Sequence, residues 1–237
     1  MKKRTTGHVN KARVLVADDH PLFREGMVQL IERESDLCCC GQTDSIVATE
    51  TTVARLKPDL LVLDLRLKDG DGLALIKSLR GRFPDLLILV VSEHDENLYA
   101  ERALRAGAKG YLMKAEAAHE VRNAIRTTLQ GDLYVSRKMS VRVLHKLLNG
   151  SSEAGANYVE RLTDRELQVF QMLGSGQGTA DIAAELHVSL KTIESHRENI
   201  KHKLGLRNAV DLLCHAVHWV HGSSGGDPRN GAPISAH

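Results

Sequence analysis

Four short apolar runs, each followed by an amphipathic stretch, are the strongest constraint on the fold of this chain. The runs are Val14–Ala17, Leu60–Leu63, Leu86–Val91 and Tyr111–Met113. Apolar runs of strand length that alternate with helical patterns predict an α/β fold, in which helices cover both faces of a parallel sheet. In such a doubly wound sheet the carboxyl ends of the strands meet at one edge, and ligands bind there.

Polar side chains that follow these runs would meet at that edge. They are Asp18, Asp19, Asp64, Ser92 and Lys114. Three neighbouring carboxylates raise one another's pKa, so a divalent cation that prefers oxygen ligands, above all Mg²⁺, is their natural partner. A carboxylate such as Asp64 can also attack phosphorus, and Lys114 and Ser92 would then stabilise the phosphoryl oxygens. Loop polarity explains any one of these residues equally well, but it does not explain all of them together.

Three segments of this region resemble the receiver domain of bacterial two-component response regulators. They are Val14–Pro21, Leu63–Arg66 and Gly107–Lys114. The resemblance implies a five-stranded parallel sheet with the strand order 2-1-3-4-5, and a sensor histidine kinase as phosphoryl donor. The roles that it implies are phospho-acceptor for Asp64, Mg²⁺ ligands for Asp18, Asp19, Asp64 and the backbone carbonyl of Arg66, switch residues for Ser92 and Tyr111, and the invariant lysine for Lys114.

The chain departs from the pattern of that family in two places. Leu67 and Lys68 stand where the family usually has Met-Pro. The loop after Asp64 therefore lacks a ring that fixes its shape, and we expect a more mobile loop with an extra positive charge near the phosphate. Glu93 follows Ser92 where a small residue is common. Because no reacting group is lost, we expect slower or altered phosphorylation.

The composition of the chain divides it near residue 150. The segment Asn149–Asn157 is small, polar and glycine-rich, which is typical of a flexible linker. We predict a receiver domain at residues 12–130, a linker with a helix at 131–158, a small helical domain at 159–221 and a disordered tail at 222–237. The tail is assigned as disordered because it has almost nothing to bury.

The second domain has the sequence pattern of a helix-turn-helix. Thr163 and Glu166 have the spacing of a capping box at a helix start. Thr179 is expected to cap a short helix, and a longer helix is expected to begin at Ser189 and to end at Gly205. Two helices joined by a tight turn, the second being longer, are typical of DNA readers.

The longer helix has one apolar and one polar face. Ile193, Ile200 and Leu204 share the apolar face. The polar face carries side chains that can contact base edges, and basic residues near its carboxyl end can meet phosphates. Any surface helix has a charged outer face, but the tight turn and the paired helices favour DNA binding. The candidate DNA contacts are Thr179, Lys191, Glu194, Ser195, Glu198, Asn199, Lys201, His202 and Lys203.

Three further segments resemble the LuxR-type helix-turn-helix. They are Leu162–Val169, Ile182–Leu186 and Ser189–Arg197. Together with the receiver, they place the chain close to the NarL/FixJ class of response regulators. That resemblance implies a transcription regulator rather than an enzyme, which binds double-stranded promoter DNA as a homodimer. It also assigns base reading to Glu194, Ser195 and Glu198, and dimerisation to a last helix whose apolar contacts are Val210, Leu213, Val217 and Trp219.

Several other classes of protein fit this sequence less well. No apolar stretch approaches the about 20 residues of a membrane-spanning helix, so we expect a cytoplasmic protein without a membrane partner. A haloacid-dehalogenase-like phosphatase would carry Asp where Arg66 stands, and a nucleotide-driven activator would need a phosphate-binding loop that is missing. Cys38–Cys40 have no metal-ligand spacing and are expected in a second strand. A receiver that no longer takes phosphate, and serves for dimerisation or ligand sensing, remains open as an alternative.

Overall fold

The computed structural model describes residues 11–141 and 158–221 of the chain. Contacts divide the chain into two compact units, residues 1–144 and 145–237. Each unit is described below by itself. The expected flexible linker at Asn149–Asn157 and the expected disordered tail at 222–237 lie outside the described residues.

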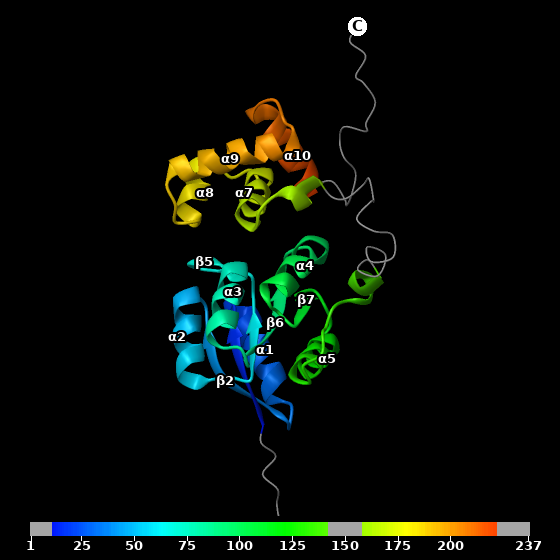
Figure 1. Cartoon of the computed structure of the whole chain (residues 1–237). Coiled ribbons are helices and arrows are strands. Elements are labelled where there is room, and N and C mark those ends of the chain that lie inside the picture. Colours follow the sequence, from blue (N-terminus) through cyan, green and yellow to red (C-terminus); the bar gives the residue numbers. More distant parts are fainter. Residues whose placement is uncertain (1–10, 142–157, 222–237) are drawn as a thin grey trace, which may run out of the picture. The chain divides into compact units, whose positions relative to one another are not determined.

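The first unit is built around a five-stranded parallel sheet (Figure 1). In spatial order its strands are β2 (Leu37–Thr43), β1 (Ala12–Ala17), β3 (Leu60–Leu63), β6 (Leu87–Ser92) and β7 (Gly110–Met113). This confirms the predicted order 2-1-3-4-5. Cys38–Cys40 lie in the second strand of the chain, as expected. The short pair β4 (Arg66–Leu67) and β5 (Gly70–Asp71) forms a separate antiparallel hairpin.

Helices cover both faces of this sheet, which explains why its strands are apolar on both sides. Helices α1 (Pro21–Glu32) and α5 (Ala118–Leu129) cover one face, and α2 (Ile46–Leu56), α3 (Gly72–Arg82) and α4 (Glu96–Ala106) cover the other (Figure 1). Val14 and Val16 belong to the buried cluster under α1 and α5, with Ile31 and Ile125. The alternate strand residue Leu15 is equally buried. Each such aliphatic side chain contributes about 1.5–3 kcal/mol through burial.

The loop after Asp64, which was expected to be mobile because it lacks a proline, makes side-chain contacts with the start of α2 and with the segment just before it. The Asp69 carboxylate accepts hydrogen bonds from the N–H groups of Ile46 and Val47, at 2.5 and 3.1 Å. The Lys68 ammonium forms an ion pair with Asp44 at 2.5 Å. Carboxylates at a helix amino terminus are favourable because they satisfy unpaired N–H groups there. These side-chain contacts, rather than a proline ring, connect the loop to the neighbouring segment.

The second unit is helical, as predicted. It consists of a 3-10 turn (Tyr158–Arg161) and the helices α7 (Asp164–Gly174), α8 (Thr179–Glu185), α9 (Leu190–Leu204) and α10 (Ala209–His221). The capping box of Thr163 and Glu166 is confirmed, and α9 begins after its Ser189 cap and ends at Gly205, whose φ is 66°. The expected cap of α8 was wrong, because Gly178 is the cap and Thr179 is the first helical residue.

Helices α7 and α10 approach each other closely in this unit. A Cβ atom on Gly174 would lie 2.4 Å from the Ala216 carbonyl oxygen, so only glycine permits this packing. Trp219 tilts against Phe170 of α7, with ring centroids 5.9 Å apart. Trp219 therefore takes part in the packing within this unit, and its expected contact with a second copy stays a prediction. Within the described residues, no helix has the length and apolar character needed to cross a membrane.

Candidate functional site

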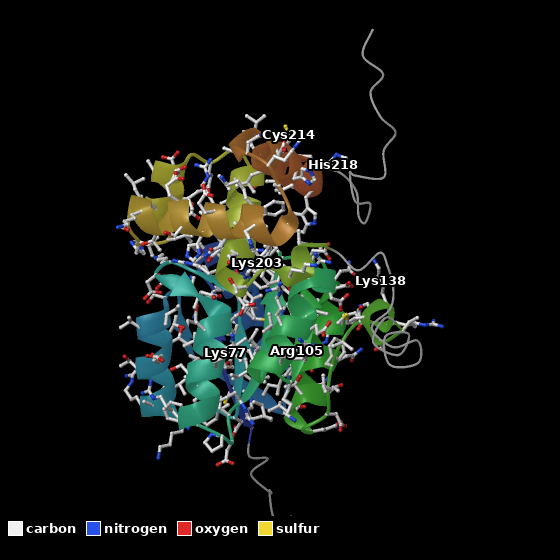
Figure 2. All side chains as sticks on the ribbon, turned by 45° about the horizontal axis from the view of Figure 1, so that its top comes forward. Lys77, Arg105, Lys138, Lys203, Cys214 and His218 are labelled. Atoms are coloured by element: carbon white, nitrogen blue, oxygen red, sulfur yellow. The ribbon has the colours of Figure 1, made fainter. Side chains whose placement is uncertain are left out.

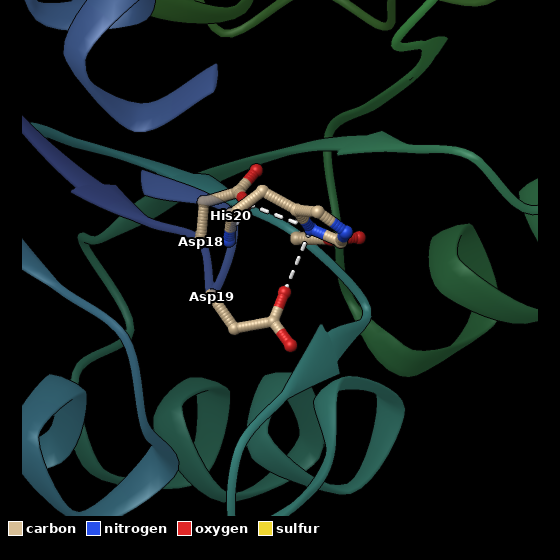
Figure 3. Close-up of side chains that lie close together, drawn as sticks. Asp18, Asp19 and His20 are labelled. Atoms are coloured by element: carbon tan, nitrogen blue, oxygen red, sulfur yellow. Dashed lines mark hydrogen bonds and ion pairs between the residues drawn. The ribbon is translucent and has the colours of Figure 1, made fainter. Parts of the chain in front are cut away.

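Four side chains with metal-ligating atoms meet at the carboxyl ends of β1 and β3. They are Asp18, Asp19, His20 and Asp64, and one ligand atom from each lies within 4.8 Å of the others. Figure 3 shows the first three of them. An octahedral ion with bonds of 2.0–2.1 Å separates opposite ligands by about 4 Å, so this spacing suits one divalent cation. Asp19 Oδ1 is buried and lies 2.8 Å from Nδ1 of His20, so both atoms can reach one ion. The residues present therefore fit a magnesium site.

Lys114 provides the positive charge at the centre of this cluster. Its ammonium lies 2.7 Å from a carboxylate oxygen of Asp18 and 2.7 Å from one of Asp64. It also lies over the ring of Phe23, 4.6 Å from the centroid. Burial lowers the pKa of Lys114, but the hydrogen bonds to the two carboxylates outweigh this effect and raise the pKa above its ordinary value. Lys114 therefore stays charged at neutral pH.

The pKa of the Asp18 carboxyl is raised, chiefly by burial. The charge of Asp64 raises this pKa to a smaller extent. Hydrogen bonds from Lys114 and from the backbone N–H of His20 oppose that rise. A cation at the cluster would favour the charged form of each carboxyl.

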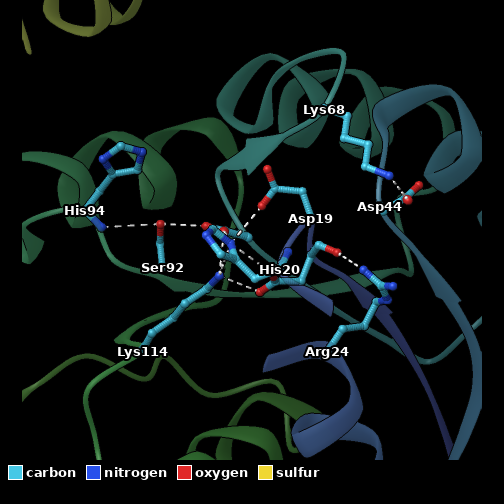
Figure 4. Close-up of polar contacts among 10 residues, drawn as sticks. Asp19, His20, Arg24, Asp44, Lys68, Ser92, His94 and Lys114 are labelled. Atoms are coloured by element: carbon cyan, nitrogen blue, oxygen red, sulfur yellow. Dashed lines mark hydrogen bonds and ion pairs between the residues drawn. The ribbon is translucent and has the colours of Figure 1, made fainter. Parts of the chain in front are cut away.

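Both oxygens of the Asp64 carboxylate are engaged. The Ser92 hydroxyl donates to Oδ1 at 2.7 Å, and the Lys114 ammonium lies 2.7 Å from Oδ2. Ser92 is fully buried, and its own oxygen lies 3.4 Å from the N–H of His94 (Figure 4). The structure thus brings together the acceptor, the hydroxyl and the ammonium that the sequence placed at the ends of three different strands.

Tyr111 lies inside the receiver unit rather than at its surface. Its side chain is fully buried, and its hydroxyl donates to the carbonyl of His94 at 2.7 Å. Burial raises the pKa of Tyr111 well above its ordinary value, so the phenol remains a hydrogen-bond donor. His94 also stacks on Tyr99, with ring centroids 4.6 Å apart. The same loop that follows Ser92 therefore receives the Tyr111 hydrogen bond, which links the two expected switch residues.

Lys68 and Glu93 depart from the family pattern; Lys68 does not point at the acceptor Asp64, and Glu93 lies at the surface. The Lys68 ammonium points to Asp44, so its charge is paired there rather than directed to the phosphate position (Figure 4). Glu93 is exposed. Arg66, whose carbonyl was expected to bind the cation, lies in the β4–β5 hairpin and pairs with Asp71.

Sequence reasoning missed two residues of this site. Nδ1 of His20 lies 2.8 Å from Oδ1 of Asp19, inside the acidic cluster. Arg24 donates a hydrogen bond to the backbone carbonyl of Asp18 at 2.7 Å and thereby fixes the loop that carries both aspartates. The signal for His20 was its position directly after the acidic pair, whereas Arg24 reaches the loop from the second turn of α1.

In the second unit, α9 exposes the polar face that the periodicity predicted. Ile193, Ile200 and Leu204 are buried. The exposed residues of the expected reading face are Lys191, Glu194, Ser195, Glu198, Asn199 and His202. The turn that precedes α9 is tight, because His187 adopts a left-handed φ of 52° and the Val188 N–H donates to the Ala183 carbonyl at 3.0 Å. The geometry is that of a helix-turn-helix.

The glutamates of this face form ion pairs with neighbouring cations of α9. Glu194 pairs with Arg197 at 3.1 Å, and Glu198 pairs with Lys201 at 2.7 Å. Arg197 also donates to the hydroxyl of Thr179 at 2.5 Å, which joins α8 to α9. Each glutamate that would read a base must therefore exchange or share its cation when DNA is bound.

Lys203 of α9 (labelled in Figure 2) forms an ion pair within the second unit. Its ammonium lies 2.6 Å from Oε2 of Glu166, whose side chain is only 5% exposed. The same oxygen accepts a hydrogen bond from the Thr163 N–H at 2.8 Å. Burial raises the pKa of Glu166, but Lys203 and the Thr163 contacts outweigh it and lower the pKa overall. This arrangement gives Lys203 a structural partner that the sequence did not reveal.

Comparison with known proteins identifies both units. Residues 14–126 match the response regulator receiver domain, and residues 160–216 match the bacterial regulatory proteins of the luxR family. The oxygen regulatory protein NreC of Staphylococcus aureus is 31% identical over 209 residues, which cover 86% of this chain and 96% of NreC.

Solved structures of response regulators also resemble this chain. RcsB from Salmonella enterica serovar Typhimurium, bound to promoter rprA in the presence of the phosphomimetic BeF3⁻, is 27% identical with a TM-score of 0.63, and the match covers 88% of this chain and 99% of RcsB. A LuxR-family two-component response regulator from Aurantimonas sp. SI85-9A1 is also 27% identical, with a TM-score of 0.55, and covers 59% of this chain and 99% of its own.

Proposed function

Because this chain belongs to the response regulators that join a receiver domain to a LuxR-type DNA-binding domain, we propose that phosphorylation of Asp64 controls its binding to promoter DNA. Members of this family are transcription regulators and not enzymes. The observation that carries the proposal is the environment of Asp64. One carboxylate oxygen meets the Ser92 hydroxyl and the other meets the Lys114 ammonium, next to two further aspartates.

In this proposal Asp64 attacks the phosphorus of a phosphohistidine on a sensor histidine kinase. A P–O bond forms to the Asp64 carboxylate as the P–N bond to the histidine breaks, and the histidine keeps the electron pair and takes up a proton. Asp18, Asp19, Asp64 and the Arg66 carbonyl would hold Mg²⁺. When bound, Mg²⁺ supplies charge neutralisation for the phosphoryl oxygens.

The remaining chemistry belongs to Lys114 and Ser92. Lys114 moves its ion pair from the Asp64 carboxylate to the phosphoryl group, and Ser92 donates its hydroxyl hydrogen to a phosphoryl oxygen. Because the Ser92 loop also receives the Tyr111 hydrogen bond at the His94 carbonyl, a shift of Ser92 reaches Tyr111 and the adjoining surface. This connection is the physical route that we propose for the switch.

The DNA-binding unit is proposed to act as a homodimer in the cytoplasm. Val210, Leu213 and Val217 form an exposed apolar stripe on α10, with side chains 67, 46 and 39% exposed. Their spacing of three and four residues places them on one side of the helix. Solved structures of the relative RcsB contain RcsB dimers on DNA. Two copies joined through this stripe would present two α9 helices to two half-sites of double-stranded DNA.

Phosphoryl labelling tests this function. The full chain is treated with phosphoramidate and Mg²⁺, and the phosphoprotein is measured by mass spectrometry. Labelling should be lost in Asp64→Asn, because an amide is not a nucleophile of this kind, and kept in Asp85→Asn, a matched change at an exposed aspartate of the same unit. Labelling that persists in Asp64→Asn would remove the acceptor assignment. A wild-type chain that takes no label would favour the alternative, a phosphate-independent receiver used for dimerisation or ligand sensing.

A further inference from the structure

We propose that His20 is a direct ligand of the cation at the receiver site, through Nδ1, and that this nitrogen shifts the metal preference of the site from Mg²⁺ towards first-row transition ions. The inference rests on the proposed function, because it concerns the same acidic cluster. It goes further by assigning a ligand of a different chemical type. A site of carboxylate, carbonyl and water oxygens suits Mg²⁺, whereas an imidazole nitrogen suits ions such as Co²⁺ and Zn²⁺.

The position of Nδ1 is that of a ligand. It lies 2.8 Å from Oδ1 of Asp19, 3.4 Å from Oδ1 of Asp18 and 4.0 Å from Oδ2 of Asp64. Adjacent ligands of an octahedral ion with bonds of 2.0–2.1 Å are separated by about 2.9 Å, and opposite ligands by about 4.1 Å. The distances from Nδ1 fall within this span, so one ion can reach the imidazole together with the carboxylates.

A further charged group lies next to Nδ1. The Lys114 ammonium is 3.3 Å from this nitrogen, so Nδ1 faces the same part of the cluster that Lys114 contacts. Imidazole binds metals through a ring nitrogen that carries no proton, and a bound ion would select that form of His20.

Asp19 faces the imidazole at the distance expected for two ligands of one ion. Its Oδ1 is buried and lies 2.8 Å from Nδ1 of His20. One cation could therefore bind the carboxylate oxygen and the imidazole nitrogen together.

The backbone holds His20 in this position. His20 is the cap residue of α1, with φ −87° and ψ 106°, and Pro21 follows at the first helical position. Its N–H donates to Oδ1 of Asp18 at 2.8 Å, and its carbonyl accepts from the Arg24 N–H at 3.0 Å. The side chain remains 47% exposed at the mouth of the cluster. An ion can therefore enter past the imidazole, and changing this side chain leaves the core intact.

Pulsed electron paramagnetic resonance tests the bond itself. The full chain is loaded with Mn²⁺, and modulation of the echo by a coordinated ¹⁴N nucleus is recorded. The wild-type chain and His119→Asn, a matched change at an exposed histidine on α5, should show the nitrogen. His20→Asn should not, and asparagine is suitable because it caps helices well. A nitrogen signal that survives in His20→Asn, or that is absent from the wild type when Mn²⁺ is bound, would overturn the inference.

A competition experiment tests the metal preference. Co²⁺ is bound to the full chain and then displaced with Mg²⁺. Only the Co²⁺ that Mg²⁺ displaces is counted, so that Co²⁺ bound to other histidines or to cysteines does not enter the measurement. The Co²⁺-to-Mg²⁺ affinity ratio should fall about tenfold in His20→Asn, the lower end of what groups around metal sites contribute, because Mg²⁺ prefers oxygen ligands and loses less than Co²⁺ when the imidazole is removed. An unchanged ratio would contradict the inference.

The acidic variants separate this inference from the proposed function. Asp19→Asn and Asp64→Asn should both lose the Mg²⁺-displaceable ion, because they remove carboxylate ligands of the cluster. If they keep it, the cation binds elsewhere and the magnesium role in the proposed function fails. If they lose it while His20→Asn behaves as wild type, the proposed function stands and only the role of His20 is refuted.

Discussion

Replacing Lys203 by alanine should destabilise the second unit rather than simply weaken its contact with phosphates. The substitution leaves the Glu166 carboxylate, 5% exposed, with the Thr163 N–H but without its cation. Removing one partner of a fully buried pair costs about 3–5 kcal/mol. The Lys203 side chain is 34% exposed, so water recovers part of that cost, and we expect a loss of about 2 kcal/mol.

Trp219 makes this loss measurable in the full chain. It is the only tryptophan of the sequence and packs on Phe170, so its fluorescence reports unfolding of the second unit alone. For a unit of this size, 2 kcal/mol corresponds to a drop in Tm of roughly 8–16 °C. Lys201→Ala is the matched control, because Lys201 pairs with Glu198, which is 68% exposed, and its loss should cost under about 1 kcal/mol.

The pH dependence of stability provides a second test of the Lys203–Glu166 pair. The pKa of Glu166 is lowered in the folded unit, so its stabilisation is complete above the ordinary value of 4.5 and is lost as pH falls through the lower folded value. The loss in free energy of unfolding caused by Lys203→Ala should therefore become smaller as the pH falls below that value. Adding Glu166→Gln should recover part of the loss at neutral pH. Equal unfolding curves for Lys203→Ala and Lys201→Ala would refute the reasoning.

Other predictions concern packing, base reading and coupling. Gly174→Ala should destabilise the second unit by about 1–3 kcal/mol, seen by Trp219 fluorescence, because its Cβ would meet the Ala216 carbonyl. Glu198→Ala should reduce base preference by about 1–3 kcal/mol, whereas Lys201→Ala should weaken binding to all DNA and flatten its salt dependence; equal losses on specific and random DNA for Glu198→Ala would contradict the reading face. If the unphosphorylated receiver hinders DNA binding, phosphorylation should raise the DNA affinity of the full chain about 5–150-fold, and the fragment Tyr158–His221 should bind DNA without phosphate; a fragment that binds no better than the unphosphorylated chain would exclude such inhibition.

The sequence predicted the sheet and the meeting of its polar ends because both follow from short-range patterns. A strand such as Leu60–Leu63 is apolar throughout and is followed by Asp64, and parallel topology alone then brings Asp64 to Asp18 and Lys114. The periodicity of α9 likewise predicted its buried side, Ile193 included. These features need only the local period of a strand or helix and the rule that parallel strands share an edge.

The sequence did not reveal contacts between distant segments, which no local pattern encodes. Lys203 and Glu166 are 37 positions apart, and Lys68 and Asp44 are 24 apart. The sequence shows that a lysine is present but not which carboxylate it pairs with. The packing of Trp219 on Phe170 is likewise a contact between two helices that only the folded unit shows.

These internal pairings bear on how the second unit would hold DNA. Lys203 is committed to Glu166, Arg197 to Thr179 and Glu194, and Lys201 to Glu198. Affinity for DNA rises with the number of phosphates that cations neutralise, so each engaged cation lowers the electrostatic contribution of a single copy. The chain's formal net charge of only +2 adds little long-range attraction. A second copy doubles the phosphate contacts with no new cation per chain. We therefore expect dimerisation along the exposed stripe of α10 to be the step through which phosphorylation of the receiver raises DNA affinity the most.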